Sequence, residues 1–232
     1  MDQVLNVSGE YCLENNSITV LVDNDSWIIP YAHHLVQALK KKGFDAEFVD
    51  SADKVYPGWV NFILGCTRII RSEVLQRNQH NLVVHESDLP KGRGFAPMAW
   101  QILEGKRSIP ICLIEATDEV DAGDIWLSDV IELDGTELCD EWRSLQGQKT
   151  VELCLKFVSA YPTLKPVKQQ GGEPSYYSRR IPADSRLDVD KSLREQFNLF
   201  RIVDNERYPA YFEMEGRVYT VQLFKVESKS GD

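Results

Sequence analysis

Short, continuously apolar segments alternate with helical stretches along most of this sequence, and that alternation limits the folds open to it. Residues 17–23 are rich in β-branched side chains, and residues 30–42 follow with an amphipathic pattern that Gly43 ends. Residues 45–49 and 59–65 have the composition of two further strands. Strands that are apolar along their whole length are buried on both faces, so we expect an open, mostly parallel α/β sheet.

The same alternation continues further along the chain. We expect a helix over residues 72–78 and a strand over residues 81–85, then a helix over residues 97–104 and a strand over residues 109–115. In an open, Rossmann-like α/β sheet, ligands bind beyond the carboxyl ends of the strands. His85 ends one of these strands and is therefore a candidate site residue.

The composition changes after a helix expected over residues 150–161. Residues 162–178 are rich in Pro, Gly and polar side chains and form the one credible linker. We therefore expect a core domain of residues 1–161, this linker, and a small C-terminal region of residues 179–232. The turn sequence Glu215-Gly216 predicts that this region carries a β-hairpin appendage beside a helix. These elements are expected at residues 191–203, 209–214 and 217–225.

Composition narrows the function classes. The 232 residues carry a formal net charge of −10 and a pI near 5.0, which leaves no electrostatic footprint for a polyanion, so no nucleic-acid partner is expected. The five cysteines lack C-x-x-C spacing and are interpreted as reduced thiols of a cytoplasmic protein, with no metal site. Neither a signal peptide nor an apolar run of roughly 20 residues is recognised, so no membrane partner is expected.

His85 and Asp121 are the strongest candidates for chemistry. Asp121 begins an Asp-Ala-Gly-Asp turn thirty-six positions after His85, which leaves room for a turn, a helix and a strand to return the chain to the same sheet edge. A histidine beside a carboxylate forms a proton-handling pair. The alternative interpretation is structural, because a lone histidine often only ends a strand and Asp and Gly commonly form tight turns.

Several motifs occur together around this pair, and they consist of His85, Ser87, Leu89-Pro90, Gly92-Arg93-Gly94, Ala96-Pro97, Ile102, Gly105 and the turn at residues 121–124. Together they resemble the signature of the folate-dependent formyltransferase superfamily, over roughly residues 18–160. The resemblance implies the formyltransferase fold, 10-formyltetrahydrofolate as formyl donor and co-substrate, His85 as general base, and Asp121 as the carboxylate that orients the imidazole.

The resemblance also implies two binding regions. The pterin is expected against the loop that leads to Asp121, and the acceptor amine beside Ser87 and the Lys91–Gly94 loop. Lys91 and Arg93 would contact a diphosphate or the glutamyl tail of the folate, and solvated loop charge is an equally good interpretation. The residues expected to bind the folate are Ser87, Leu89, Ala116, Thr117, Asp118, Val120 and Asp124, and those expected to bind the acceptor are Lys91, Arg93 and Gly94.

The acceptor is inferred by elimination within the superfamily. The tRNA enzyme carries a whole C-terminal barrel, whereas this chain has only a short, acidic region after the linker. Glycinamide ribonucleotide formyltransferase has no appended helix and hairpin. The resemblance therefore favours an N-formyltransferase for nucleotide-linked amino-dideoxy sugars of surface glycans such as lipopolysaccharide. A non-catalytic folate- or nucleotide-binding module and a formyltransferase for another small amine remain alternatives.

One position departs from the superfamily pattern, which has an Asn two residues before the histidine where this chain has Val83. Asn81 shares a strand face with His85, but four residues at about 3.3 Å each place it roughly 13 Å away, too far to replace the missing amide. A donor to a developing oxyanion is worth about 3 kcal/mol, and the candidates to supply it are protonated His85, a backbone N–H and the hydroxyl of Ser87.

Three further features have structural interpretations. His80 is interpreted as a surface residue. Arg179 and Arg180 are interpreted as partners in an interdomain ion pair more readily than as ligand contacts. The hairpin carries apolar side chains that could supply a homodimer interface as readily as a core, so the sequence does not decide the oligomeric state. These side chains are Tyr208, Tyr211, Phe212 and Tyr219.

Overall fold

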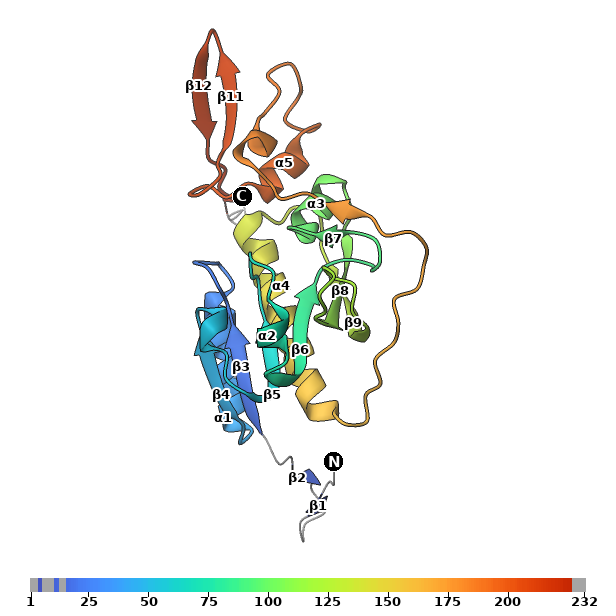
Figure 1. The fold of residues 1–232 in the computed structure, drawn as a ribbon. Helices are drawn as coiled ribbons and strands as arrows, with labels where there is room; N and C mark the ends of the chain where they lie inside the picture. Colours follow the sequence, from blue (N-terminus) through green and yellow to red (C-terminus); the bar gives the residue numbers. More distant parts are fainter. Residues whose placement is uncertain (1–3, 6–10, 13–15, 227–232) are drawn as a thin grey trace, which may run out of the picture. The chain divides into compact units, whose positions relative to one another are not determined.

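The computed structural model describes residues 4–5, 11–12 and 16–226 (Figure 1). The described residues form two compact units, and the domain boundaries expected at residues 161 and 179 stay a prediction. The first unit comprises the chain up to residue 85 with residues 112–128 and 147–170, and the second comprises residues 86–111, 129–146 and the chain from residue 171.

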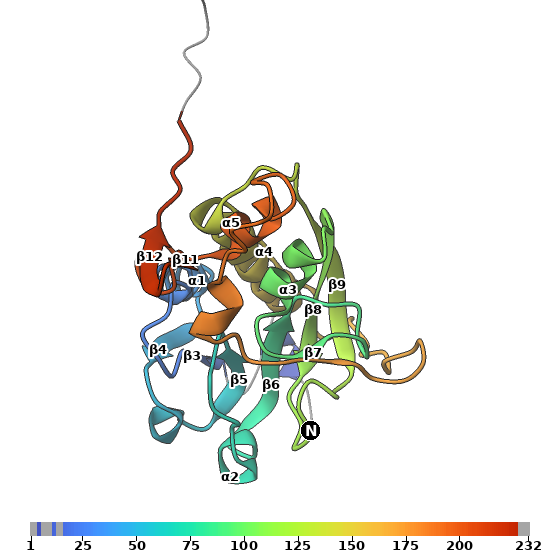
Figure 2. The same ribbon diagram turned by 90° about the horizontal axis from the view of Figure 1, so that it is seen from above.

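A six-stranded sheet contains the candidate histidine. Across this sheet the order is β4 (Asp45–Val49), β3 (Ser17–Leu21), β5 (Gly58–Ile63), β6 (Asn78–His85), β8 (Ser108–Glu115) and β9 (Ile125–Glu132) (Figure 1, Figure 2). The first four strands run parallel, and β8 is antiparallel to β6 with His85 opposite Cys112. The expected open, mostly parallel α/β sheet is therefore confirmed.

Apolar clusters on both sides of the strands explain why their sequences are continuously apolar. Helix α1 (Ile29–Lys41) and the later turns of helix α4 (Cys139–Ala160) contribute to the larger cluster. The smaller cluster includes Val74 of the short helix α2 (Ser72–Leu75) and Leu21, whose neighbour Val20 belongs to the larger one. Adjacent strand residues thus point to opposite faces and both faces are covered.

Several elements differ from the sequence-based expectation. Helix α2 ends at Leu75 instead of residue 78, and β6 begins at Asn78, three residues before the expected strand. Helix α4 begins at Cys139, about three turns earlier than expected, because the Glu141 carboxylate accepts the backbone N–H of Leu138 at 2.8 Å and caps a mostly polar first turn. Helix α5 (Phe197–Ile202) is shorter than expected, since side-chain hydrogen bonds between Ser192 and Glu195 form a turn ahead of it. Strand β9 was not expected, because its mixed polar and apolar sequence lacks a clear period.

The hairpin at the C-terminal end is confirmed. Strands β11 (Ala210–Met214) and β12 (Arg217–Val221) pair in register through a turn in which Glu215 and Gly216 both have positive φ, at 49° and 73°. Positive φ at both central residues suits a tight two-residue hairpin turn. Tyr208 and Tyr219 are 51 % and 46 % exposed, so of the two alternatives left open by the sequence, a core role does not apply to these two side chains, and dimerisation stays a prediction.

Among the described residues, no helix has both the length and the apolar character needed to cross a membrane.

The remaining elements are short. The short elements are β1 (Val4–Leu5), β2 (Tyr11–Cys12), the 3-10 turns at Ala52–Lys54 and Pro182–Ser185, β7 (Arg93–Gly94), β10 (Tyr176–Tyr177) and helix α3 (Pro97–Leu103).

Candidate functional site

His85 ends β6 and faces Asp121. The Nδ1 atom of His85 lies 3.6 Å from Oδ2 of Asp121, an ion-pair distance slightly longer than a hydrogen bond. The two side chains are 5 % and 13 % exposed, so the pair is largely shielded from water. The structure thus brings together the two residues selected from the sequence, and a shielded histidine-carboxylate pair can accept and release a proton. Their catalytic roles stay a prediction.

The turn that carries Asp121 has a defined backbone conformation. Asp121 has a φ of 50°, in the left-handed region that Asp tolerates better than most residues. Gly123 approaches the end of β8 so closely that a Cβ atom would overlap the carbonyl oxygen of Glu115. The backbone N–H of Glu115 donates to the carbonyl of Asp124 at 2.9 Å and closes the turn at its base. These contacts fix the backbone of the turn from which the Asp121 side chain extends.

Glu115 connects the base of this turn to β6 and β9. Its carboxylate accepts the backbone N–H of Asn81 at 2.7 Å and the indole N–H of Trp126 at 2.9 Å, and it lies 3.2 Å from Nδ1 of His80. The His80 ring is 13 % exposed and packs against three aromatic rings at centroid distances of 5.1 to 5.7 Å. The interpretation of His80 as a surface residue is therefore wrong.

The loop residues expected to bind the folate follow Glu115 directly. The backbone N–H of Ala116 donates to a carbonyl of β6 at 2.6 Å, and Oδ1 of Asp118 accepts the hydroxyl of Ser72 at 2.6 Å. The loop is thus fixed at two points while much of it faces solvent. Thr117, Asp118 and Val120 are exposed, whereas Ala116 and Asp124 are half-buried.

The residues after His85 belong to the second unit. Arg93 is buried, and its Nη1 lies 3.5 Å from the hydroxyl of Tyr176. A Cβ atom on Gly94 would overlap the carbonyl oxygen of Tyr177, so glycine is required where β7 pairs with β10. The binding roles expected for this segment stay predictions. Ser87 and Leu89 are buried, and Lys91 is exposed.

Val83 stands where the superfamily pattern has an amide, and it packs against the smaller apolar cluster. The Asn81 amide donates to the carbonyl of Leu75 at 2.7 Å, and its Oδ1 accepts from Asn61 at 3.2 Å. Asn81 is only 4 % exposed. Its polar atoms are therefore used inside the sheet, in agreement with the distance argument that it cannot replace the missing amide.

Asp23 is a polar residue at the carboxyl end of β3 that the sequence patterns did not single out. Its carboxylate accepts the backbone N–H groups of Thr67 and Arg68 at 2.8 and 3.1 Å and the amide of Asn24 at 2.8 Å. Burial alone would raise the pKa of the Asp23 carboxyl, but these hydrogen bonds outweigh it and hold the pKa below its usual range. Asp23 thus ties the loop after β5 to the end of β3.

The two arginines after β10 contact residues of the second unit, and the interdomain ion pair expected for them stays a prediction. The Arg179 guanidinium lies 4.5 Å from the centroid of the Phe95 ring, a cation-π geometry. Arg180 donates to the carbonyl of Ile202 at 2.8 Å and to the hydroxyl of Ser185 at 3.3 Å. Burial lowers the pKa of Arg180. Both contacts lie within the second unit.

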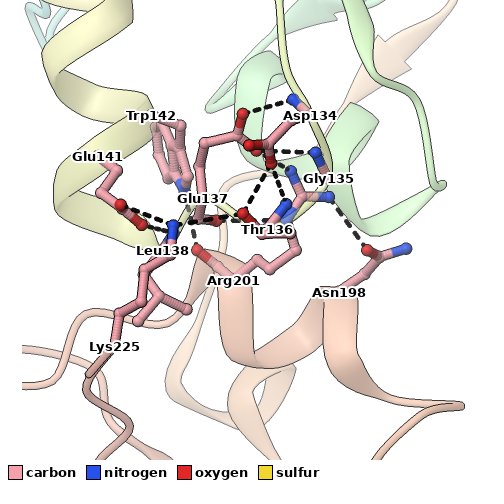
Figure 3. A network of polar contacts seen from close by, with 10 residues as sticks. All are labelled: Asp134, Gly135, Thr136, Glu137, Leu138, Glu141, Trp142, Asn198, Arg201 and Lys225. Carbon is pink, nitrogen blue, oxygen red and sulfur yellow. Dashed lines mark hydrogen bonds and ion pairs between the residues drawn. The ribbon is translucent and has the colours of Figure 1, made fainter. Parts of the chain in front are cut away.

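A polar network joins the loop before α4 to α5 (Figure 3). Arg201 lies at its centre, where Nη2 is 3.0 Å from Oε2 of Glu137 and Nη1 is 3.2 Å from Oδ1 of Asn198. The Glu137 carboxylate also accepts the backbone N–H groups of Asp134 and Gly135 at 2.5 and 3.0 Å. The buried charges are thus compensated, which identifies this network as a structural element.

Similarity to known proteins agrees with this geometry. The sequence pattern of the formyl transferase family matches residues 14–144, more than half of the chain. Methionyl-tRNA formyltransferase from Rickettsia prowazekii is 27 % identical over 121 residues, which cover 52 % of this chain and 40 % of that protein. This chain therefore spans well under half the length of that relative.

Three solved structures share the fold. Methionyl-tRNA formyltransferase from Clostridium thermocellum superposes with a TM-score of 0.76 at 20 % identity, over 92 % of this chain and 94 % of that one. A 4-N formyltransferase from Francisella tularensis has a TM-score of 0.66 at 18 % identity, over 91 % and 99 %. HypX from Aquifex aeolicus in complex with tetrahydrofolic acid has a TM-score of 0.69 at 17 % identity, over 89 % and 37 %. The chain belongs to the formyl transferase family.

Proposed function

We propose that this chain transfers the formyl group of 10-formyltetrahydrofolate to the amine of a nucleotide-linked amino-dideoxy sugar. The observation that carries the proposal is the shielded pair of His85 and Asp121, 3.6 Å apart, at the carboxyl end of a strand in a chain of the formyl transferase family. Formyl transfer to an amine needs a group that removes a proton from the attacking nitrogen, and this pair has that chemistry.

Each member of the pair has a defined role in the proposed reaction. The acceptor nitrogen forms a bond to the formyl carbon, and the bond from that carbon to N10 of the folate breaks. His85 removes the proton that the acceptor nitrogen loses, and this proton is returned to N10, directly or through water. Asp121 orients the imidazole, since a carboxylate that faces Nδ1 leaves Nε2 as the nitrogen that can accept the proton.

The folate is proposed to lie against residues 116–124. In HypX from Aquifex aeolicus, a protein of the same fold, the solved structure contains tetrahydrofolic acid. In this chain the loop is fixed at Ala116 and Asp118, and most of its residues between β8 and the Asp121 turn are exposed, so a ligand can reach them. Ser87 and Leu89, which follow His85 in the sequence, are proposed as further folate-binding residues.

A nucleotide-linked amino sugar is proposed as the acceptor. The solved structures that share the fold include a 4-N formyltransferase from Francisella tularensis, and this similarity supports a sugar acceptor. The net charge of −10 argues against tRNA, whose phosphates favour positive surfaces. Lys91 and Arg93 are proposed to contact the diphosphate, with Gly94 allowing close approach. Methionyl-tRNA, the acceptor that several relatives' names suggest, is the competing candidate for the test below.

The hydrogen-bond donor to the oxyanion that forms during the reaction must differ from the Asn side chain of the superfamily pattern. Val83 stands at the position of that Asn, and the Asn81 amide donates to another group. Protonated His85, a backbone N–H and the Ser87 hydroxyl are the proposed substitutes. Without any of them, a loss of about 3 kcal/mol of transition-state stabilisation would leave a chain that binds folate but turns over slowly.

The test is release of tetrahydrofolate from 10-formyltetrahydrofolate in the presence of UDP-, dTDP- and GDP-linked amino sugars, with initiator methionyl-tRNA as a separate arm. Turnover with one of the sugars supports the proposal. Turnover only in the tRNA arm overturns the proposed acceptor. His85→Asn and Asp121→Asn should each reduce turnover by at least about 100-fold, the usual lower range for loss of a general base. His34→Asn, on the exposed face of α1, is the matched control and should leave turnover unchanged. Folate binding without turnover in every arm would indicate a binding module.

A further inference from the structure

Gln169 holds the turn that carries Asp121. Its side-chain Nε2 donates to the carbonyl of Asp121 at 2.7 Å and to the carbonyl of Gly123 at 2.9 Å. A primary amide has two N–H groups, and both are directed to carbonyls of the same turn, two residues apart. The side chain thereby bridges the two ends of the segment in which Asp121 has its left-handed conformation.

Backbone pairing sets the position of Gln169. Val167, two residues before it, exchanges two backbone hydrogen bonds with Ile125, each 2.8 Å long. Ile125 begins β9, directly after the Asp121 turn. The segment that follows α4 is therefore anchored beside this turn, although its composition indicated a linker. Gln169 reaches the two carbonyls from a fixed backbone and loses little conformational entropy in doing so.

The geometry of His85 and Asp121 makes this support important. Their 3.6 Å separation is already at the outer edge of a direct interaction. The turn is held from the β8 side by the close approach of Gly123 to Glu115. Gln169 supplies hydrogen bonds to carbonyls of the turn itself. Loss of these bonds would let the Asp121 peptide rotate, and a displacement of about 1 Å in a catalytic group can cost about 100-fold in rate.

We propose that Gln169 is a positioning residue, which fixes the Asp121 turn and through it the orientation of the His85 imidazole. The kinetic consequence rests on the proposed function, whereas the effect on the imidazole is independent of it. A neutral histidine whose Nδ1 faces a carboxylate favours the form protonated at Nδ1. Displacement of Asp121 should therefore shift His85 toward the form protonated at Nε2.

The experiment compares Gln169→Met with Gln170→Met in the full chain. Met keeps the side-chain length but has no N–H donor, and Gln170 is an exposed neighbour of the same residue type. Long-range proton-nitrogen NMR spectra of the imidazoles report the protonated ring nitrogen. The chain has four histidines, and His85→Asn assigns the relevant signals. Gln169→Met should shift the His85 signals toward the Nε2-protonated form, and Gln170→Met should leave them in place.

The kinetic arm should show at least about a tenfold lower kcat for Gln169→Met, with the KM for the acceptor within about twofold of the parent chain. Gln169→Glu keeps the shape and removes the donors, so it should behave in the same way, which separates the missing donors from a packing effect of Met. Unchanged His85 signals in both Gln169 variants, with native-like spectra elsewhere, would overturn the proposal. If the parent chain transfers no formyl group, the proposed function fails, and the imidazole spectra still decide the role of Gln169.

Discussion

Arg201 and Glu137 form a buried ion pair with 3.0 Å between Nη2 and Oε2, and the arginine side chain is only 1 % exposed. Removing one partner of such a pair leaves an uncompensated buried charge and typically costs about 3–5 kcal/mol. We therefore expect Arg201→Met, which keeps the apolar stem, to lower the free energy of unfolding by about 3 kcal/mol. Urea unfolding followed by circular dichroism measures this loss.

An exposed pair in the same unit provides the control. Arg186 and Glu213 lie 3.4 Å apart with side chains 58 % and 48 % exposed. Exposed pairs contribute about 0–1 kcal/mol, so Arg186→Met should change the free energy of unfolding by no more than that. Equal losses in Arg186→Met and Arg201→Met would contradict the assignment of Arg201 as the centre of the network in Figure 3.

Glu115 is expected to stabilise the first unit because its carboxylate accepts two N–H groups. Glu115→Leu would leave the backbone N–H of Asn81 and the indole N–H of Trp126 without their acceptor. An unsatisfied buried donor costs about 1–3 kcal/mol, so the free energy of unfolding should fall by about 2–6 kcal/mol. Urea unfolding monitored by tryptophan fluorescence is the measurement, because Trp126 lies at the altered site.

Two variants test whether the acceptor itself matters. Glu115→Gln keeps one carbonyl oxygen and should cost clearly less than Glu115→Leu. Glu173→Leu, at an exposed position, should have almost no effect on the free energy of unfolding. A similar loss for Glu115→Gln and Glu115→Leu would show that the carboxylate charge, and not hydrogen-bond acceptance, accounts for the stabilisation.

The strands that form the centre of the sheet could be predicted from the sequence because each is a short apolar run. Strand β4 occurs at the expected residues, and β5 and β8 differ by one or two positions. Strand β9 and the pair β7 and β10 could not be predicted, because their sequences are mixed or only two residues long and depend on long-range partners. The first turns of α4 could not be predicted either, because a polar helix start has little periodic signal.

Strand β8, which leads to the Asp121 turn, runs antiparallel to β6 and ends opposite Leu82, so the carboxyl ends of the two strands do not meet. The convergence of His85 and Asp121 was nevertheless predictable from the resemblance of the motifs around them. The residues that support them were not. Gln169 lies in a Pro- and Gly-rich stretch, Glu115 ends an apolar strand, and His80 precedes one, so each has an ordinary local context. Most of their partners are more than thirty residues away in sequence, as with His80 and Glu115, and a periodic pattern contains no information on such contacts.

Asp23 should make the stability of the first unit depend on pH. Its folded-state pKa lies below the usual value, so its contribution to stability is complete above the unfolded pKa of about 3.9 and is lost as the pH falls through the folded value. Asp23→Asn keeps one acceptor oxygen but removes the charge. The difference in free energy of unfolding between the parent chain and Asp23→Asn should therefore be constant from pH 7 to about 5 and shrink below about 4.

Urea titrations across this pH range measure that difference. Asp190→Asn, at an exposed position, is the control, and its difference from the parent chain should stay near zero. A difference for Asp23→Asn that does not change with pH would mean that the hydrogen-bond geometry, and not the carboxylate charge, joins the loop after β5 to the end of β3.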